Sequence, residues 1–280
     1  MTHHGRIAYM PLTTYPEAIA DDAIRAAVAF AEPLGCTLSV TTFSVDLPRA
    51  SSGLGDFLIN VPSLVHSAEE KSREECRRLE RLVREAAPTP LGVLCTTREV
   101  AWGGVPGAAS AEARYFDLAL LPWSDETVLS QEMAEAVVFG SGRPAILVPP
   151  SGGLGSLEHI AIAWDGSRVA ARALGDALPL LAEGGLISVL TVRDEKPLSG
   201  SNVAAALASS LAKRGLKAKL VEATLGNRTI AEALQDTALS NGVQLLAMGG
   251  FGHSRFRDFV LGGATTGVLE KLRLPVLLSH

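Results

Sequence analysis

Short apolar runs alternate with longer segments of helical periodicity along the whole chain. The apolar runs contain few polar residues, which is typical of strands buried on both faces of a sheet. The helical segments end near glycine, a common stop signal for helices. Strands alternating with helices predict right-handed βαβ units and a mostly parallel sheet covered by helices on both faces.

This pattern occurs twice. We expect five strands in each half, at 6–12, 36–43, 91–97, 116–122 and 143–150, then at 159–164, 186–192, 217–224, 243–250 and 274–280. The helices expected between them lie at 17–35, 67–87, 106–116, 167–185, 201–216, 230–242 and 264–272. The sequence therefore predicts an α/β fold of two doubly wound, Rossmann-like domains in tandem, each with a five-stranded parallel sheet of order 3-2-1-4-5.

The predicted domains cover residues 1–150 and 157–280, and the segment SGGLGS at 151–156 has the composition of a linker. The halves differ in two places. Ile7 and Leu91 are 84 positions apart, whereas Ile160 and Lys217 are 57 apart, which predicts an insert in the first domain at about 46–66. The loop after the fourth strand contains no glycine in the first half but is rich in glycine in the second.

Composition restricts the class of protein. Hydrophobic residues make up 47% and charged residues 20% of the 280 residues, so the chain can build a core. The net charge of −5 argues against a nucleic-acid partner. The three cysteines are scattered, which predicts neither a disulfide framework nor a metal site. We find no secretory leader and no long apolar run, and we expect a cytoplasmic protein without membrane contact.

The candidate ligand site lies where the strand order of the second sheet reverses, because open parallel sheets bind ligands there, at the carboxyl ends of their strands. Two segments should meet at this point: AWDGS at 163–167 and GGFGHSRFRDFVLGG at 249–263. Glycines let a main chain approach phosphate closely, and the start of a helix attracts anions. We therefore expect main-chain amides for a polyanion at Gly249, Gly250, Gly252, Gly262, Gly263 and Ala264.

Side chains of the same segments could add contacts. Asp165 could accept a hydrogen bond from a ribose hydroxyl, and His253, Ser254 and Arg255 could contact phosphate. Each feature also has a plainer interpretation. A glycine pair often only makes a turn, Asp-Gly-Ser commonly caps a helix, and a loop histidine is commonly solvated.

With these residues the chain resembles the universal stress protein family. The resemblance is carried by IAIAWDGS, LLAMGGFGHSRFRDFVLGGAT and LPVLLSH in the second half, and more faintly by FGSGRPAILVPP in the first. It implies the tandem-domain form of the family. Nucleotide-binding members share a pattern of Gly, two residues, Gly, nine residues, Gly, then Ser or Thr. Gly249, Gly252 and Gly262 fit this spacing, but Gly263 replaces the hydroxyl residue, and Thr265 two positions further on is a candidate substitute.

The resemblance implies a role for further residues at the site. It places Asp165 near the nucleotide and the main chain at about Val192 near adenine. Ala163 and Trp164 close the first strand beside them, and Trp164 is bulkier than the small aliphatic residue usual there, so it either stacks on a base or fills the pocket. The first domain lacks the pattern, because Met10-Pro11-Leu12 and Pro122-Trp123 replace its elements. We therefore expect no nucleotide in the first domain.

The family also implies partners. Its single domains often dimerise through their last strands, so we expect 145–149 to pair with 276–279 inside this chain as a pseudo-dimer. A further homodimer through other surfaces, and an unknown protein partner, stay open.

Several functions remain as alternatives. The first is a cytosolic stress-response protein that binds ATP, ADP or AMP, with or without Mg²⁺, as a regulatory ligand. The second is a weak ATP hydrolase, disfavoured because the chain has no GxxxxGK[ST] motif; we assign no catalytic residue and no metal ligand. The third is a nucleotide-free scaffold, or a binder of another small molecule or partner. An adenine-nucleotide domain of the electron-transferring flavoprotein type is a weaker fourth.

Overall fold

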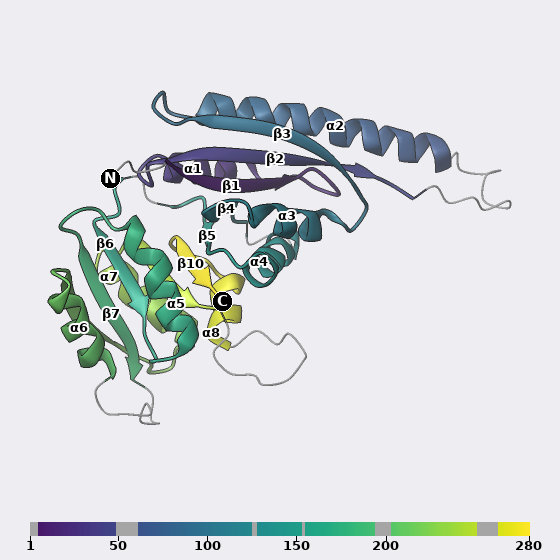
Figure 1. Cartoon of the computed structure of the whole chain (residues 1–280). Coiled ribbons are helices and arrows are strands. Elements are labelled where there is room, and N and C mark those ends of the chain that lie inside the picture. Colours follow the sequence, from purple (N-terminus) through teal and green to yellow (C-terminus); the bar gives the residue numbers. More distant parts are fainter. Residues whose placement is uncertain (1–4, 49–60, 125–127, 153–154, 194–202, 251–262) are drawn as a thin grey trace.

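The computed structural model describes residues 5–48, 61–124, 128–152, 155–193, 203–250 and 263–280. One sheet runs through the whole molecule and carries helices on both faces (Figure 1). The first half contains β1 (Arg6–Thr13), α1 (Asp21–Ala31), β2 (Cys36–Asp46), α2 (Val61–Ala86), β3 (Val93–Ala101), α3 (Val105–Ala113), β4 (Leu118–Pro122), α4 (Val128–Gly140) and β5 (Ala145–Val148). The second half contains β6 (His159–Ala163), α5 (Arg168–Ala177), β7 (Leu186–Arg193), α6 (Val203–Lys213), β8 (Lys217–Thr224), α7 (Ile230–Ser240), β9 (Leu245–Gly249), α8 (Gly263–Glu270) and β10 (Val276–Ser279).

The strand order of the sheet is β3-β2-β1-β4-β5-β10-β9-β6-β7-β8. Read from its outer edge, each half has the order 3-2-1-4-5, and neighbouring strands within a half are parallel. The predicted fold class is confirmed.

The two halves join through β5 and β10, which pair in the antiparallel direction with Leu277 opposite Ile146. This confirms the pairing expected between the last strands of the two halves. Because the joint is antiparallel, the carboxyl ends of the strands point in opposite directions in the two halves. The joint also covers an edge of each half-sheet that would otherwise expose unpaired main-chain groups.

Each face of the sheet carries its own hydrophobic layer, and each layer draws side chains from both halves. One layer joins strand residues such as Leu38 and Leu277 to Leu174 of α5 and Leu211 of α6. The other layer lies under α3, α4, α7 and α8. The nearly continuous apolar strands predicted from the sequence are needed because side chains on both faces are buried.

The helices depart from the predicted ranges most in three places. No range was predicted for α4 (Val128–Gly140), which lies between the strands expected at 116–122 and 143–150. The α2 helix begins at Val61, so the end of the segment predicted as a loop at 46–66 is helical. The α5 helix ends at Ala177 and continues as a single 3-10 turn over Leu178–Leu180, whereas we expected a helix to 185. Pro179 accounts for this end, because proline lacks the amide that a helix interior requires. No helix among the described residues combines the length and apolar character of a membrane span.

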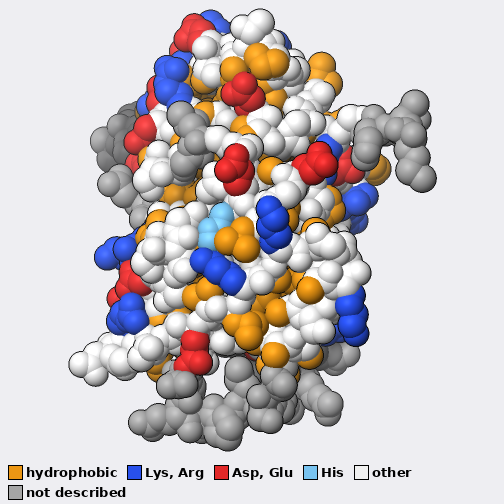
Figure 2. All heavy atoms as spheres, turned by 90° about the vertical axis from the view of Figure 1, so that its left-hand side faces the viewer, with side chains coloured by type: hydrophobic (Ala, Val, Ile, Leu, Met, Phe, Trp, Pro, Cys, Tyr) orange, Lys and Arg blue, Asp and Glu red, His pale blue; other side chains and the backbone are white. Residues whose placement is uncertain are grey.

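The free edges of the sheet are β3 and β8. Figure 2 shows the left-hand side of Figure 1, where hydrophobic side chains gather among lysines and arginines on the second half of the chain. Leu220 of β8 is 55% exposed, and Lys217 and Lys219 lie on the same strand. Charged side chains on an edge strand are a common protection against unwanted strand pairing.

Candidate functional site

The site predicted from the sequence lies at the carboxyl ends of β6 and β9, which are neighbours in the sheet. After β6 the chain turns into α5 on one face, and α8 covers the opposite face, so the strand order reverses at this point. The described part of the site consists of the turn 164–167, the end of β7 at Val192, the pair Gly249-Gly250 and the first turn of α8. Gly252, His253, Ser254 and Gly262 lie outside the described residues.

The turn after β6 is shaped by helix capping. The Asp165 carboxylate accepts a hydrogen bond from the Ser167 amide at 2.8 Å, and the Ser167 hydroxyl accepts one from the Ala170 amide at 3.2 Å. Gly166 between them has a φ of +80°, a left-handed conformation that favours glycine. The capping interpretation of Asp-Gly-Ser therefore holds. Asp165 is also exposed, so its carboxylate stays within reach of a ligand.

Trp164 turns away from the face that carries α7 and α8. Its indole Nε1 donates to the Val203 carbonyl at the start of α6 at 3.2 Å, and its ring packs against the layer under α5 and α6. Three other predicted site residues, Ala163, Val192 and Ala264, pack on the opposite layer. Trp164 therefore does not occupy their side of the sheet, and its contacts give no support to a stacking role on that side.

The glycine pair at the end of β9 has packing and hydrogen-bond roles. A Cβ added at Gly249 would lie 2.5 Å from Val169 Cγ2 and 2.8 Å from the Val169 carbonyl carbon, so only glycine lets β9 meet α5 this closely. The Gly250 amide donates to the Ser279 carbonyl at 2.8 Å, which extends the ladder between β9 and β10. The expectation that the Gly250 amide serves a polyanion fails in this arrangement, because that amide already has a main-chain acceptor.

The candidate residues in the first turn of α8 differ in their exposure to solvent. Gly263 is exposed, and a Cβ added there would meet no atom within 4 Å. Thr265 is only 3% exposed, so its side chain belongs to the interior. The first amides of a helix lack acceptors within the helix, and its positive end favours anions. Gly263 and Ala264 therefore lie where a helix favours an anion, whereas the burial of Thr265 makes it a poor substitute for the missing hydroxyl.

The corresponding end of the first half is filled with side chains. Met10 and Leu12 are fully buried at the end of β1, and Trp123 after β4 is 2% exposed. Trp123 continues the sheet, because its amide donates to the Val148 carbonyl at 2.9 Å. These bulky residues occupy the positions where the second half has Asp165 and the glycine pair.

Metal and thiol chemistry find no support in the described part of the chain. No group of three or more His, Cys, Asp or Glu residues lies close enough there to hold a metal ion. Cys36, Cys76 and Cys95 are free, and burial raises the pKa of each thiol above its ordinary value. A raised pKa leaves little thiolate near neutral pH, so these thiols are poor nucleophiles.

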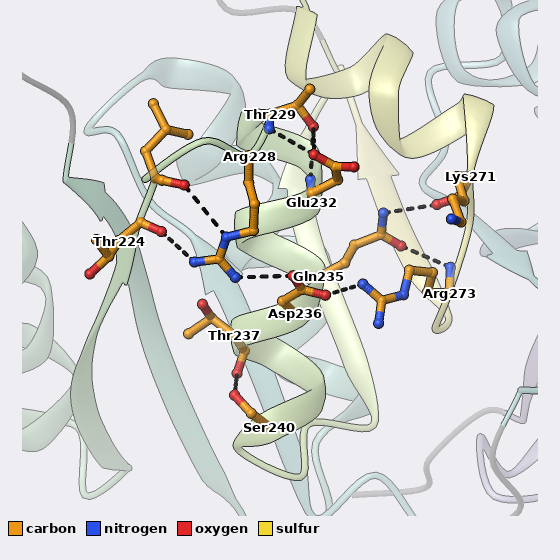
Figure 3. A network of polar contacts seen from close by, with 11 residues as sticks. Thr224, Arg228, Thr229, Glu232, Gln235, Asp236, Thr237, Ser240, Lys271 and Arg273 are labelled. Carbon is orange, nitrogen blue, oxygen red and sulfur yellow. Dashed lines mark hydrogen bonds and ion pairs between the residues drawn. The ribbon is translucent and has the colours of Figure 1, made fainter.

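Sequence reasoning missed a polar groove of about 700 Å³ between α7 and α8, which is lined in part by residues of the polar network drawn in Figure 3. Gly263 and Thr266 line it at the start of α8, and Asp236 and Arg273 line it at the other end. These residues are distant in the sequence and follow no motif spacing. Only the packing of α7 beside α8 brings them together.

Comparison with known proteins places the second half in a family. Residues 156–280 match the model of the Universal stress protein family. A curated universal stress protein from Synechocystis sp. is 29% identical over 150 residues, which are 51% of this chain and 49% of that protein. The match therefore spans about half the length of this relative.

Two solved structures share the fold of nearly the whole chain. A universal stress protein from Archaeoglobus fulgidus has a TM-score of 0.69 at 15% identity, with 97% of this chain and 95% of that chain covered. A putative universal stress protein from Pseudomonas aeruginosa has a TM-score of 0.52 at 13% identity, with 98% and 93% covered. At these identities the likeness concerns the fold.

Proposed function

We propose that the second half of the chain, which matches the Universal stress protein family, binds an adenine nucleotide, ATP, ADP or AMP, as a regulatory ligand. The same proposal makes the chain a cytoplasmic stress-response protein without an efficient catalytic activity. It divides the chain into a first domain at 1–150 that takes no nucleotide and a second domain at 157–280 that does.

One observation carries this proposal. Gly249, the first glycine of the spacing found in nucleotide-binding members, ends β9 where the strand order reverses, and Gly252 and Gly262 of that spacing follow it in the sequence. The exposed Asp165 ends the neighbouring strand, and the first turn of α8 follows the glycines. In this proposal Asp165 accepts a hydrogen bond from a ribose hydroxyl, and the amides of Gly263 and Ala264 donate to the phosphates. The layer that holds Ala163 and Val192 offers apolar contact to adenine.

The alternative of a nucleotide-free scaffold also has specific support. Gly263 lacks the hydroxyl that the family pattern supplies, the Gly250 amide is bonded within the sheet, and the glycine at 249 is explained by packing against Val169. A hydrolase has less support, because Asp165 is the only carboxylate among the described residues that we assign to the site. Phosphoryl transfer also needs charge neutralisation and a placed nucleophile.

The first test is direct. The purified protein is denatured and its supernatant analysed for ATP, ADP and AMP, and ATP is titrated by calorimetry against the wild type and Gly252→Glu. We expect the wild type to bind and the variant to lose binding by at least about tenfold, because a carboxylate in the loop repels phosphate.

Gly107→Glu is the matched control. Gly107 lies on α3 in the first half, and a Cβ added there meets no atom within 4 Å. This variant adds the same charge to the chain and should bind ATP like the wild type. Absence of binding by the wild type, with no nucleotide in the supernatant, would favour the scaffold.

A further inference from the structure

The α8 helix, which starts at the proposed phosphate site, packs chiefly against α7. Its orientation therefore depends on these contacts and on Val268 and Leu269, which are buried in the layer under both helices. The helices approach closely at Gly267, where an added Cβ would lie 2.8 Å from the Cβ of Ala231. Polar contacts beyond the end of α8 add to the restraint on the angle between the helices.

A buried amide supplies one of these contacts. Gln235 of α7 is 1% exposed. Its Nε2 donates to the Lys271 carbonyl at 2.9 Å, and its Oε1 accepts from the Arg273 amide at 2.8 Å. Gln235 thus holds the chain just beyond the end of α8 through its main-chain groups.

Asp236, the next residue, connects three segments (Figure 3). Its carboxylate accepts from Arg228 Nη1 at 3.0 Å and from Arg273 Nη1. Arg228 also donates to the main-chain carbonyls of Thr224 and Leu225 at the end of β8. The carboxylate therefore links the end of β8, helix α7 and Arg273, which lies three residues beyond the end of α8.

The charge on Asp236 is well supported. The hydrogen bond from Arg273 and then that from Arg228 hold the pKa of its carboxyl below the ordinary value. It stays ionised at neutral pH, when both arginines are charged. Two guanidinium groups on one carboxylate restrict the geometry more than a single ion pair does.

A groove separates the two helices beside this network. Its space of about 700 Å³ extends from Gly263 at the start of α8 to Arg273 beyond its end. Side chains of α7 and α8 are therefore not in continuous contact on this side. Hydrogen bonds at the far end of the groove then take a larger share in fixing the orientation of α8.

The first half ties its corresponding helices together differently. Among its described residues, the Arg114 guanidinium donates to the Gly140 carbonyl, and the Arg143 guanidinium donates to the Arg114 carbonyl. These bonds join the ends of α3 and α4 through main-chain acceptors. The carboxylate link occurs in the half for which we propose a nucleotide, and the carbonyl links occur in the half for which we propose none.

We propose that Asp236 is a positioning residue for the nucleotide site, which holds α8 so that the amides of Gly263 and Ala264 face the phosphates. This inference rests on the proposed function. The side chains of Asp236, Arg228 and Arg273 are 32%, 40% and 39% exposed. Ion pairs with this exposure contribute little to global stability. Loss of Asp236 therefore reorients α8 without unfolding the protein.

The experiment compares ATP affinity in the full chain, by calorimetry, for the wild type, Asp236→Ala and Asp236→Glu. All variants are measured well below their unfolding temperatures, so that an effect on global stability alone leaves the affinity unchanged. We expect Asp236→Ala to bind about fivefold more weakly, and Asp236→Glu to stay within about twofold of the wild type because it keeps a carboxylate.

Asp21→Ala is the matched control. Asp21 of α1 pairs with Arg78 of α2 at 2.8 Å, and their side chains are 48% and 39% exposed. This pair also joins two helices, but it lies in the first half, so its loss should leave ATP affinity unchanged. Hydrogen exchange of residues 263–270 gives a second readout: exchange should be faster in Asp236→Ala than in the wild type and unchanged in Asp21→Ala.

The outcomes separate the two proposals. A wild type that binds no adenine nucleotide overturns the proposed function, and this inference with it. If the wild type binds ATP and Asp236→Ala binds it equally well, only the inference is overturned. Equal weakening by Asp21→Ala would also overturn it, because the effect would then be general to exposed helix-joining ion pairs.

Discussion

At the scale of single residues, Gly249 shows how one position serves two interpretations. Its place in the glycine spacing predicts a role near phosphate. Its packing shows a different requirement, because any side chain at this position would overlap Val169 of α5. The two roles are compatible, but only the packing role can be tested without a ligand.

We predict that Gly249→Ala lowers the free energy of unfolding by about 1–3 kcal/mol, as overpacking commonly does. Urea unfolding followed by tryptophan fluorescence measures this change. Gly263→Ala is the control, since a Cβ there meets no atom within 4 Å, and it should unfold at the wild-type urea concentration or slightly above. If Gly249→Ala unfolded at the same urea concentration as the wild type, the packing role would be contradicted.

Residues of the site differ in how far the sequence can place them. The glycine spacing and the end of the strand at Asp165 locate the site, because both depend on local pattern alone. The direction of Trp164 could not be predicted, because it depends on the hydrogen bond to Val203, 39 positions further on. The same holds for Gly250, whose amide meets Ser279 only once β9 and β10 are paired.

At the scale of elements, α8 is the helix on which the proposed site depends most. Its first residue, Gly263, departs from the family pattern. A Cβ added at Gly263 would meet no atom within 4 Å, so a side chain can be introduced there without a clash. A substitution at Gly263 can therefore restore the hydroxyl side chain of the family pattern.

We predict that Gly263→Ser tightens ATP binding by about tenfold, because a hydroxyl can donate a hydrogen bond to a charged phosphate. Calorimetric titration checks this result. Gly263→Ala separates the hydroxyl from any stiffening of the helix, and it should bind within about twofold of the wild type. Equal gains in both variants would count against a phosphate contact at this position.

Most elements were predictable from apolar periodicity, and β8 was predicted to the residue. The α2 helix was expected to start later because its first turns belong to a segment rich in Gly, Ser and Pro, although Val61, Leu64 and Val65 have helical spacing. The β2 strand extends three residues beyond the expected end, to Asp46. Its polar end is stable because Ser72 of α2 accepts a hydrogen bond from the Val45 amide at 3.1 Å, a contact with no local sequence signal.

At the scale of the whole molecule, the antiparallel joint and the shared layers make the two halves one structural unit. Leu277 of β10 is fully buried, pairs with Ile146 and belongs to the layer that includes residues of both halves. Elements that share a buried core usually unfold together.

We predict that Leu277→Ala lowers the free energy of unfolding by about 2–5 kcal/mol and destabilises both halves equally. Trp102 and Trp123 report on the first half and Trp164 on the second, so single-tryptophan variants can follow each half during urea unfolding. Coincident transitions are expected in the wild type and in Leu277→Ala. Separate transitions, with only the second half affected by the substitution, would show that the halves are independent.

Gly250 lies at the seam between the halves. Its amide is bonded to Ser279, its carbonyl faces the His280 ring at 3.1 Å, and it lies against Val138 and Phe139 of α4. The glycine-rich segment of the second half therefore follows a residue, Gly250, that contacts a helix of the first half. A backbone shift at Gly250 would therefore change its contacts with α4, and this links the start of the proposed nucleotide loop to a helix of the first half.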